Sequence, residues 1–174
     1  CFIPKGNYQE FLNRYNESRP GQIVDIDGNV MGTHRGVEFF TIGQRRGIGI
    51  NSNRQLYVTG LDAKSRTVVV GSESDLYSNS LRASGLNWTS DTAPVGPIDV
   101  SVKIRYKSEE AKATLYPGDD HVNVIFNEPQ RAITPGQAIV FYKNTAVLGG
   151  AYIENVLPEN SSCNPEQHNL NFVH

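Results

Sequence analysis

The second half of the chain alternates between apolar and polar residues with a period of two. Within residues 98–106, Val100, Val102, Ile104 and Tyr106 alternate with polar positions. Successive side chains of a β-strand point to opposite faces, so this pattern predicts strands with one buried face. Turn residues separate six such segments, which are residues 81–89, 98–106, 111–116, 121–126, 138–143 and 146–153. Six short consecutive strands predict a small closed β-barrel, because closure removes exposed sheet edges.

The first part of the chain has a mixed pattern that predicts one helix and a small sheet. Apolar residues between Tyr8 and Tyr15 occur at helical spacing, so we expect an amphipathic helix over residues 7–18. The dipeptide Asp27-Gly28 lies between two short runs rich in β-branched residues and is typical of a tight hairpin turn. The predicted strands are residues 22–26, 29–33, 56–61 and 67–71, with a further strand over 39–42 that leads into a glycine-rich loop.

These patterns predict a mainly β protein with two domains and a tail. Residues 1–78 form a small α+β central domain with one N-terminal helix, and residues 79–157 form the six-stranded barrel. Residues 158–174 show no apolar periodicity and are expected to be a loose tail.

The overall charge gives no sign of a nucleic-acid partner, because the formal net charge is -2. Any contact with RNA must therefore be local. Residues 103–107 form one basic stretch, and residues 35–54 form another, with four arginines against one glutamate. Either stretch fits a phosphate-binding surface or simply solvated charges on strands. The four arginines of the second stretch are Arg35, Arg45, Arg46 and Arg54.

Cysteine and histidine spacing argues against a structural metal site. Cys1 and Cys163 are the two cysteines, and neither they nor the four histidines have ligand spacing. No metal site is therefore predicted, and the histidines are expected on the surface or in structural roles. The low number of cysteines is consistent with a reducing cytoplasm. The longest apolar run, residues 138–142, is far shorter than the ~20 residues of a membrane-spanning helix.

Several residues are candidates for chemistry or binding. Cys1 becomes reactive if a cationic setting favours its thiolate, although an isolated cysteine is more often a small buried residue. In the loop Gly43-Gln44-Arg45-Arg46-Gly47, glycines allow close approach and guanidinium groups can grip phosphate, or the loop is a simple exposed turn.

Two further candidates lie in the predicted barrel. Arg105 and Tyr106 combine a cation with an aromatic ring that can stack on a base. The alternative is that one of them is a core residue, because adjacent residues of a strand face opposite ways. Gln137 follows the turn Thr134-Pro135-Gly136 and can present an amide to RNA.

Four long segments give the chain a specific resemblance. It resembles the C-terminal part of the bacterial tRNA-specific 2-thiouridylase (MnmA/TrmU) family over residues 1 to about 157, with the segments in family order. The resemblance implies a missing ATP-binding domain and a barrel similar to that of translation factors. The segments are residues 1–4 (CFIP), 40–49 (FTIGQRRGIG), 102–106 (VKIRY) and 128–142 (EPQRAITPGQAIVFY).

This resemblance implies a chemistry for the whole enzyme. Such enzymes use ATP, expected with Mg, to adenylate the C2 oxygen of the wobble uridine, and a cysteine persulfide then supplies sulfur. Cys1 matches the persulfide-bearing cysteine, and a sulfur-donor protein is the expected partner besides tRNA. The nucleotide-binding loop and a second family cysteine lie upstream of the matched part. We therefore expect no cofactor and no thiolation activity in this fragment by itself.

The resemblance also implies that the central domain and the barrel hold the tRNA. Arg105, Tyr106 and Gln137 match tRNA-contacting positions by motif, whereas Arg45 and Arg46 are candidates on physical grounds only. The chain departs from the family pattern at Ala151, where a third glycine is expected, and in the tail from Pro158.

Two other interpretations compete with the enzyme. One is a β-barrel module that binds RNA or protein without catalysing a reaction. The other treats Cys1 as a processed terminus, either an N-terminal nucleophile or the acylated cysteine of a lipoprotein. Against a lipoprotein, Phe2-Ile3-Pro4 leads directly into a predicted helix instead of a flexible polar tether.

Overall fold

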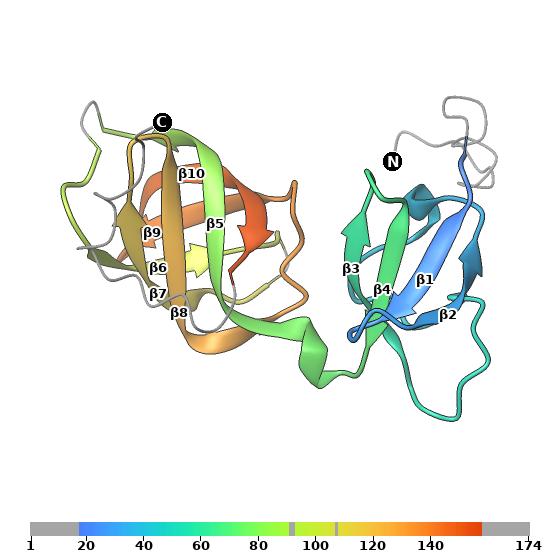
Figure 1. Ribbon diagram of the computed structural model, residues 1–174. Coiled ribbons are helices and arrows are strands. Elements are labelled where there is room, and N and C mark those ends of the chain that lie inside the picture. Colours follow the sequence, from blue (N-terminus) through green and yellow to red (C-terminus); the bar gives the residue numbers. More distant parts are fainter. Residues whose placement is uncertain (1–17, 91–92, 107, 158–174) are drawn as a thin grey trace, which may run out of the picture. The chain divides into compact units, whose positions relative to one another are not determined.

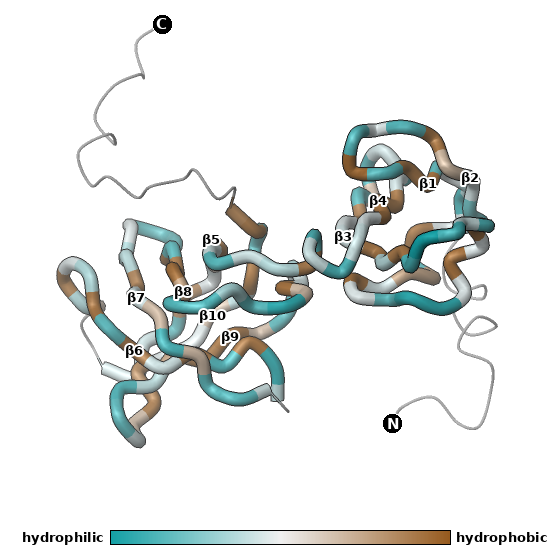
Figure 2. The backbone as a smooth tube through the Cα atoms, turned by 90° about the horizontal axis from the view of Figure 1, so that it is seen from below, coloured by the Kyte–Doolittle hydropathy of each residue, from teal (hydrophilic) through white to brown (hydrophobic). Residues whose placement is uncertain are grey.

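The computed structural model describes residues 18–90, 93–106 and 108–157, which form two compact units divided between Tyr77 and Ser78 (Figure 1). Strands dominate both units, and hydrophobic stretches recur along them in Figure 2. The first unit contains the strands β1 (Gly21–Asp25), β2 (Val30–His34), β3 (Tyr57–Asp62) and β4 (Thr67–Gly71), and the short 3-10 helices η1 (Val37–Phe39) and η2 (Ser74–Leu76). The predicted helix over residues 7–18 and Cys1 lie outside the described part, apart from Ser18.

The first unit is built on a four-stranded sheet in the order β2-β1-β4-β3. β1 and β2 form the predicted hairpin, and its turn is fixed by the Asp25 carboxylate, which accepts hydrogen bonds from the backbone N–H groups of Asp27 (3.0 Å) and Asn29 (2.8 Å). β1 pairs in parallel with β4, and β3 is antiparallel to β4. The buried core of this unit consists of Ile23, Ile48, Val58, Val68 and Val70.

The predicted strand over residues 39–42 is wrong. η1 ends at Phe39, and the chain then enters a long connection to β3. Gly43 adopts a φ of 88° there, a conformation that favours glycine, and its N–H donates to the Val58 carbonyl at 2.8 Å. The apolar run has the sequence pattern of a strand because Phe40 packs against the core, as a strand residue would.

The second unit is the predicted six-stranded closed barrel, with neighbours in the order β10-β5-β8-β7-β6-β9 (Figure 1). The mainly β fold is therefore confirmed. Its interior includes Leu81, Leu115, Ile139, Phe141 and Ile153, each at most 2% exposed. The strands are β5 (Tyr77–Trp88), β6 (Ile98–Lys103), β7 (Ala111–Pro117), β8 (His121–Arg131), β9 (Ala138–Lys143) and β10 (Ala146–Val156).

β6 ends three residues earlier than its alternation predicts. Ile104 still points into the core at 5% exposure, but the chain turns after Lys103. The turn is closed by Ser108, whose N–H and hydroxyl both donate to the Arg105 carbonyl, at 3.2 and 2.9 Å. Arg105 and Tyr106 therefore lie in a turn at the end of the barrel, where they are free of strand alternation.

Replacing Phe141 with alanine should destabilise the barrel. Phe141 is fully buried, and its ring centroid lies 5.8 Å from that of Trp88. Loss of a buried phenylalanine leaves a cavity and costs about 3–5 kcal/mol. Urea unfolding followed by the fluorescence of Trp88, the single tryptophan, measures the change. The exposed Val147 serves as control, and a Phe141→Ala effect as small as that of Val147→Ala would contradict the assignment of this core.

Candidate nucleic-acid interface

The pairing of β6 with β9 brings three of the predicted binding residues to one end of the barrel. These strands are antiparallel, with Val102 opposite Phe141 and Lys103 opposite Val140. The turn that follows β6 therefore lies beside the segment that precedes β9. The first carries Arg105 and Tyr106, and the second carries Gln137.

The side chain of Arg105 holds this end of the barrel together. Its Nη2 donates to the carbonyl of Arg131 at 2.7 Å and also to the carbonyl of Ala132. Ala132 is buried and has a φ of 53°, an unusual conformation for a residue with a side chain. The Thr134 hydroxyl donates to the same Ala132 carbonyl at 3.0 Å. Arg105 thus anchors the bend at which the chain leaves β8.

Tyr106 and Gln137 face solvent, in contrast to Arg105. Tyr106 is 93% exposed, so its ring is available for stacking. Gln137 is also exposed, and its backbone is fixed by hydrogen bonds with Thr134 (3.3 Å) and Ile153 (2.9 Å). A fixed backbone with a free amide side chain suits hydrogen bonding to a base edge.

Tyr152 belongs to the same end of the barrel and was missed in the sequence. It pairs with Ala138, the neighbour of Gln137, and is 60% exposed. The flanking residues Ala151 and Ile153 are buried, so the alternation along β10 contained the signal that Tyr152 faces outward. Two exposed tyrosines therefore lie near Gln137.

The loop that carries Arg45 and Arg46 is held rigidly in the first unit. Ile48 is 7% exposed and packs into the core, and the Gln44 carbonyl accepts the Val58 N–H at 2.9 Å. The Gln44 side chain accepts the Thr41 N–H at 3.1 Å and donates to the Arg46 carbonyl at 2.9 Å. Both arginines are exposed. The loop thus presents two cations from a fixed backbone.

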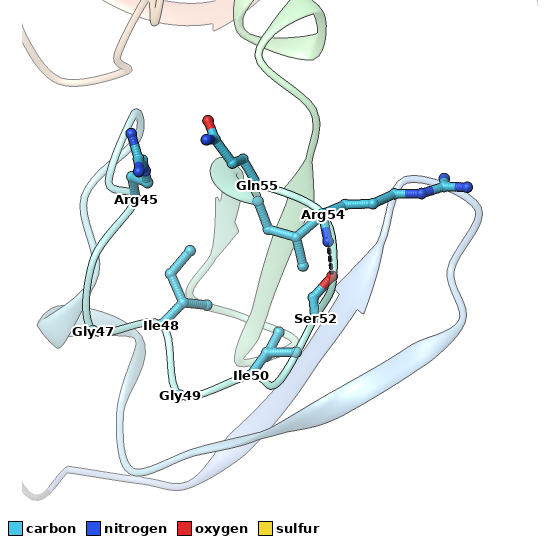
Figure 3. Close-up of a pocket in the computed structure, with 9 residues that line it drawn as sticks. Arg45, Gly47, Ile48, Gly49, Ile50, Ser52, Arg54 and Gln55 are labelled. Atoms are coloured by element: carbon cyan, nitrogen blue, oxygen red, sulfur yellow. Dashed lines mark hydrogen bonds between the residues drawn. The ribbon is translucent and has the colours of Figure 1, made fainter.

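Arg45 also acts on the buried Tyr57. A hydrogen bond to the Glu73 carboxylate, together with burial, raises the pKa of the Tyr57 hydroxyl, while the positive charge of Arg45 opposes this shift. Figure 3 shows Arg45 and Arg54 on opposite sides of a pocket of about 210 Å³, beside Ile48 and Ile50.

The described residues contain no cluster of three or more histidine, cysteine or acidic side chains that could hold a metal ion. Of the histidines in this part, His34 is buried and His121 contacts Asp120 at 2.9 Å, where the hydrogen bond lowers the pKa of Asp120. No helix among the same residues is long and apolar enough to span a membrane.

Two family models match the two units in order. The tRNA methyl transferase PRC-barrel domain matches residues 9–72, and the aminomethyltransferase β-barrel domain matches residues 78–153. The tRNA-specific 2-thiouridylase MnmA of Halothermothrix orenii is 45% identical over 157 residues, which are 88% of this chain and 44% of that protein. The enzyme of the same name from Koribacter versatilis is also 45% identical, over 161 residues, with the same two coverages.

The chain belongs to the tRNA-specific 2-thiouridylase family. The resemblance carried by the four sequence segments is thereby confirmed. The MnmA protein of Acetivibrio thermocellus, at 44% identity, is again matched over 44% of its length. The chain thus spans less than half the length of the thiouridylases it matches.

Arg105→Ala should destabilise the barrel of this thiouridylase-family chain even without RNA. The substitution leaves the carbonyls of Arg131 and Ala132 without their guanidinium donor, which costs about 1–3 kcal/mol. Urea unfolding monitored at Trp88 provides the measurement. Tyr106→Ala, one residue along, should change the stability by less than about 0.5 kcal/mol because the side chain is exposed. Equal effects of the two substitutions would disprove the anchoring role of Arg105.

Proposed function

We propose that the chain is the tRNA-binding portion of a tRNA-specific 2-thiouridylase. The observation that carries the proposal is the 45% identity to enzymes of that name across 88% of the chain. The exposed side chains of Tyr106 and Gln137, at one end of the barrel, support an RNA contact there. A base stacks on the ring of Tyr106 while the Gln137 amide forms a hydrogen bond.

Arg105 acts in this proposal chiefly as a positioning residue. Its Nη2 is engaged by two backbone carbonyls, so it fixes the segment that leads to Gln137. Arg45 and Arg46 add phosphate contacts from the first unit, because one guanidinium group can donate two parallel hydrogen bonds to a phosphate. With a net charge of -2, binding depends on these local cations and weakens as salt increases.

For the whole enzyme we propose ATP-dependent sulfur transfer in the cytoplasm. The C2 oxygen of the wobble uridine of tRNA attacks the α-phosphate of ATP and pyrophosphate leaves, so that the adenylated oxygen becomes a leaving group. Mg would neutralise the phosphate charges of ATP. The terminal sulfur of a persulfide on Cys1 replaces it, and the oxygen leaves with AMP. A second cysteine elsewhere in the enzyme then attacks the Cys1 sulfur, which forms a disulfide between the two cysteines and leaves the transferred sulfur on C2. A thiol reductant reduces this disulfide, and a donor protein restores the persulfide. No described residue is assigned to ATP.

Titration of the chain with tRNA at low salt tests the binding surface. We expect Tyr106→Ala to weaken binding by about tenfold to a hundredfold, since stacking on one ring contributes about 1–3 kcal/mol. Tyr106→Phe keeps the ring and should bind like the unchanged chain. Lys143→Ala, at the other end of β9, removes an exposed cation as a control. Absence of tRNA binding, or equal binding by Tyr106→Ala, rules out this surface.

Cys1→Ser in the full-length enzyme tests the sulfur transfer. A hydroxyl cannot carry a persulfide, so 2-thiouridine in tRNA should disappear while tRNA binding is kept. Mass spectrometry of tRNA nucleosides measures the product, and Cys163→Ser is the matched control. If thiolation persists in Cys1→Ser, another residue carries the sulfur. A full-length protein that binds tRNA but forms no 2-thiouridine even with Cys1 intact would support the alternative of a non-catalytic RNA-binding module.

A further inference from the structure

A second and larger pocket lies beside the glycine-rich loop of the first unit. Its volume is about 460 Å³, within the ~300–1,000 Å³ typical of sites for small molecules. It is lined by residues from the end of β2, from η1 and from the loop. The lining residues are Thr33, His34, Arg35, Phe39, Phe40, Gln44, Arg46, Gly47, Ile48 and Gly49.

The charge of this pocket has one sign. Arg35 and Arg46 are both exposed and line it, whereas no aspartate or glutamate among the described residues does. Glu38, on the same 3-10 helix as Phe39, lines a different hollow together with Lys64 and Arg66. The pocket therefore suits an anionic group.

Aromatic rings stand next to these cations. Phe39 and Phe40 are half-buried and line the pocket, and the Arg35 guanidinium carbon lies 6.0 Å from the centroid of the Phe39 ring. Cations stack on aromatic faces at such distances. Two guanidinium groups beside two aromatic side chains match a ligand that carries both a phosphate and a flat ring.

His34 lines the pocket and also carries a buried polar atom. Its Nε2 lies 3.1 Å from the Arg66 carbonyl and must donate to it, so Nδ1 is the acceptor of the neutral ring. Phe40 packs edge-on against the ring at 5.3 Å between centroids. His34 is only 7% exposed, and its Nδ1 is buried without a hydrogen-bond partner among the described residues. Such an orphaned buried atom is unusual.

The backbone of the loop is open on this side. Gly47 and Gly49 have φ values of 72° and 83°, which favour glycine, and a side chain built at Gly49 would meet no atom within 4 Å. Without side chains at these positions, a phosphate can approach the main chain closely.

We propose that this pocket binds a nucleotide unit, with the phosphate held by Arg35 and Arg46 and the base against Phe39 and Phe40. The nucleotide belongs either to a strand of RNA or to a free nucleoside monophosphate. Its assignment to RNA rests on the proposed function, whereas the site itself does not. The site is separate in sequence from the barrel residues Tyr106 and Gln137.

NMR titration of the 174-residue chain tests the site. Adenosine 5′-monophosphate should cause saturable shifts of the Gly47 and Gly49 amides and of the Gln44 side-chain amide. Inorganic phosphate should bind at least about tenfold more weakly, because stacking on one ring contributes ~1–3 kcal/mol. Absence of saturable shifts at these residues, or equal affinities for the two probes, would overturn the proposal.

Variants separate ligand contact from packing. Arg35→Gln and Phe39→Leu should each weaken binding of the monophosphate about tenfold, and the leucine keeps an apolar side chain in place. Lys64→Gln removes an exposed cation that does not line the pocket and should leave the affinity unchanged. Amide spectra of each variant without ligand show whether it is folded. Folded Arg35→Gln and Phe39→Leu variants with unchanged affinity would overturn the assignment.

Competition with tRNA identifies the source of the nucleotide. If tRNA displaces the monophosphate and Arg35→Gln weakens tRNA binding, the site takes a nucleotide of RNA. If tRNA leaves the bound monophosphate in place, the site is confirmed as one for free nucleotide. If the barrel surface does not bind tRNA, Tyr106→Ala will leave tRNA binding unchanged. The monophosphate titration does not depend on that result.

Discussion

Closure of the barrel is the constraint on which the placement of its candidate residues depends. Each of the six strands has hydrogen-bonded neighbours on both sides, and β10 completes the circle between β9 and β5. Within this closed circle β6 and β9 are antiparallel neighbours, so the turn after β6 must lie beside the segment before β9. Tyr106 and Gln137 become neighbours because the strands that adjoin them pair, although thirty residues of sequence separate them.

In the first unit, the packing of a loop onto a sheet fixes the positions of the candidate residues. Its four strands form a sheet, and the long connection between η1 and β3 is held onto that sheet by Ile48 in the core. Ile48, together with the backbone hydrogen bonds between the loop and Val58, thereby determines where Arg45 and Arg46 emerge. The same insertion places Gly47 and Gly49 against the end of β2, where they meet His34 and the phenylalanines in the wall of one pocket.

Most strands could be predicted from the sequence because their alternation reports directly on burial. The end of β6 could not, since Ile104 continues the alternation although the backbone has already turned. The role of Arg105 was equally hidden: its partners are carbonyls, which no side-chain pattern reveals, and one belongs to Ala132 with its unusual φ. The wall formed around His34 depends on contacts between β2 and a distant loop, and sequence spacing carries no signal for those.

The hydrogen bonds of the Gln44 side chain have a thermodynamic consequence for recognition. By joining Thr41 to Arg46, that side chain restricts the loop during folding, before any ligand arrives. The conformational entropy of the loop is therefore lost in the folding step and does not count against association. Hydrogen bonds within the loop can in this way strengthen binding as effectively as an added contact to the ligand.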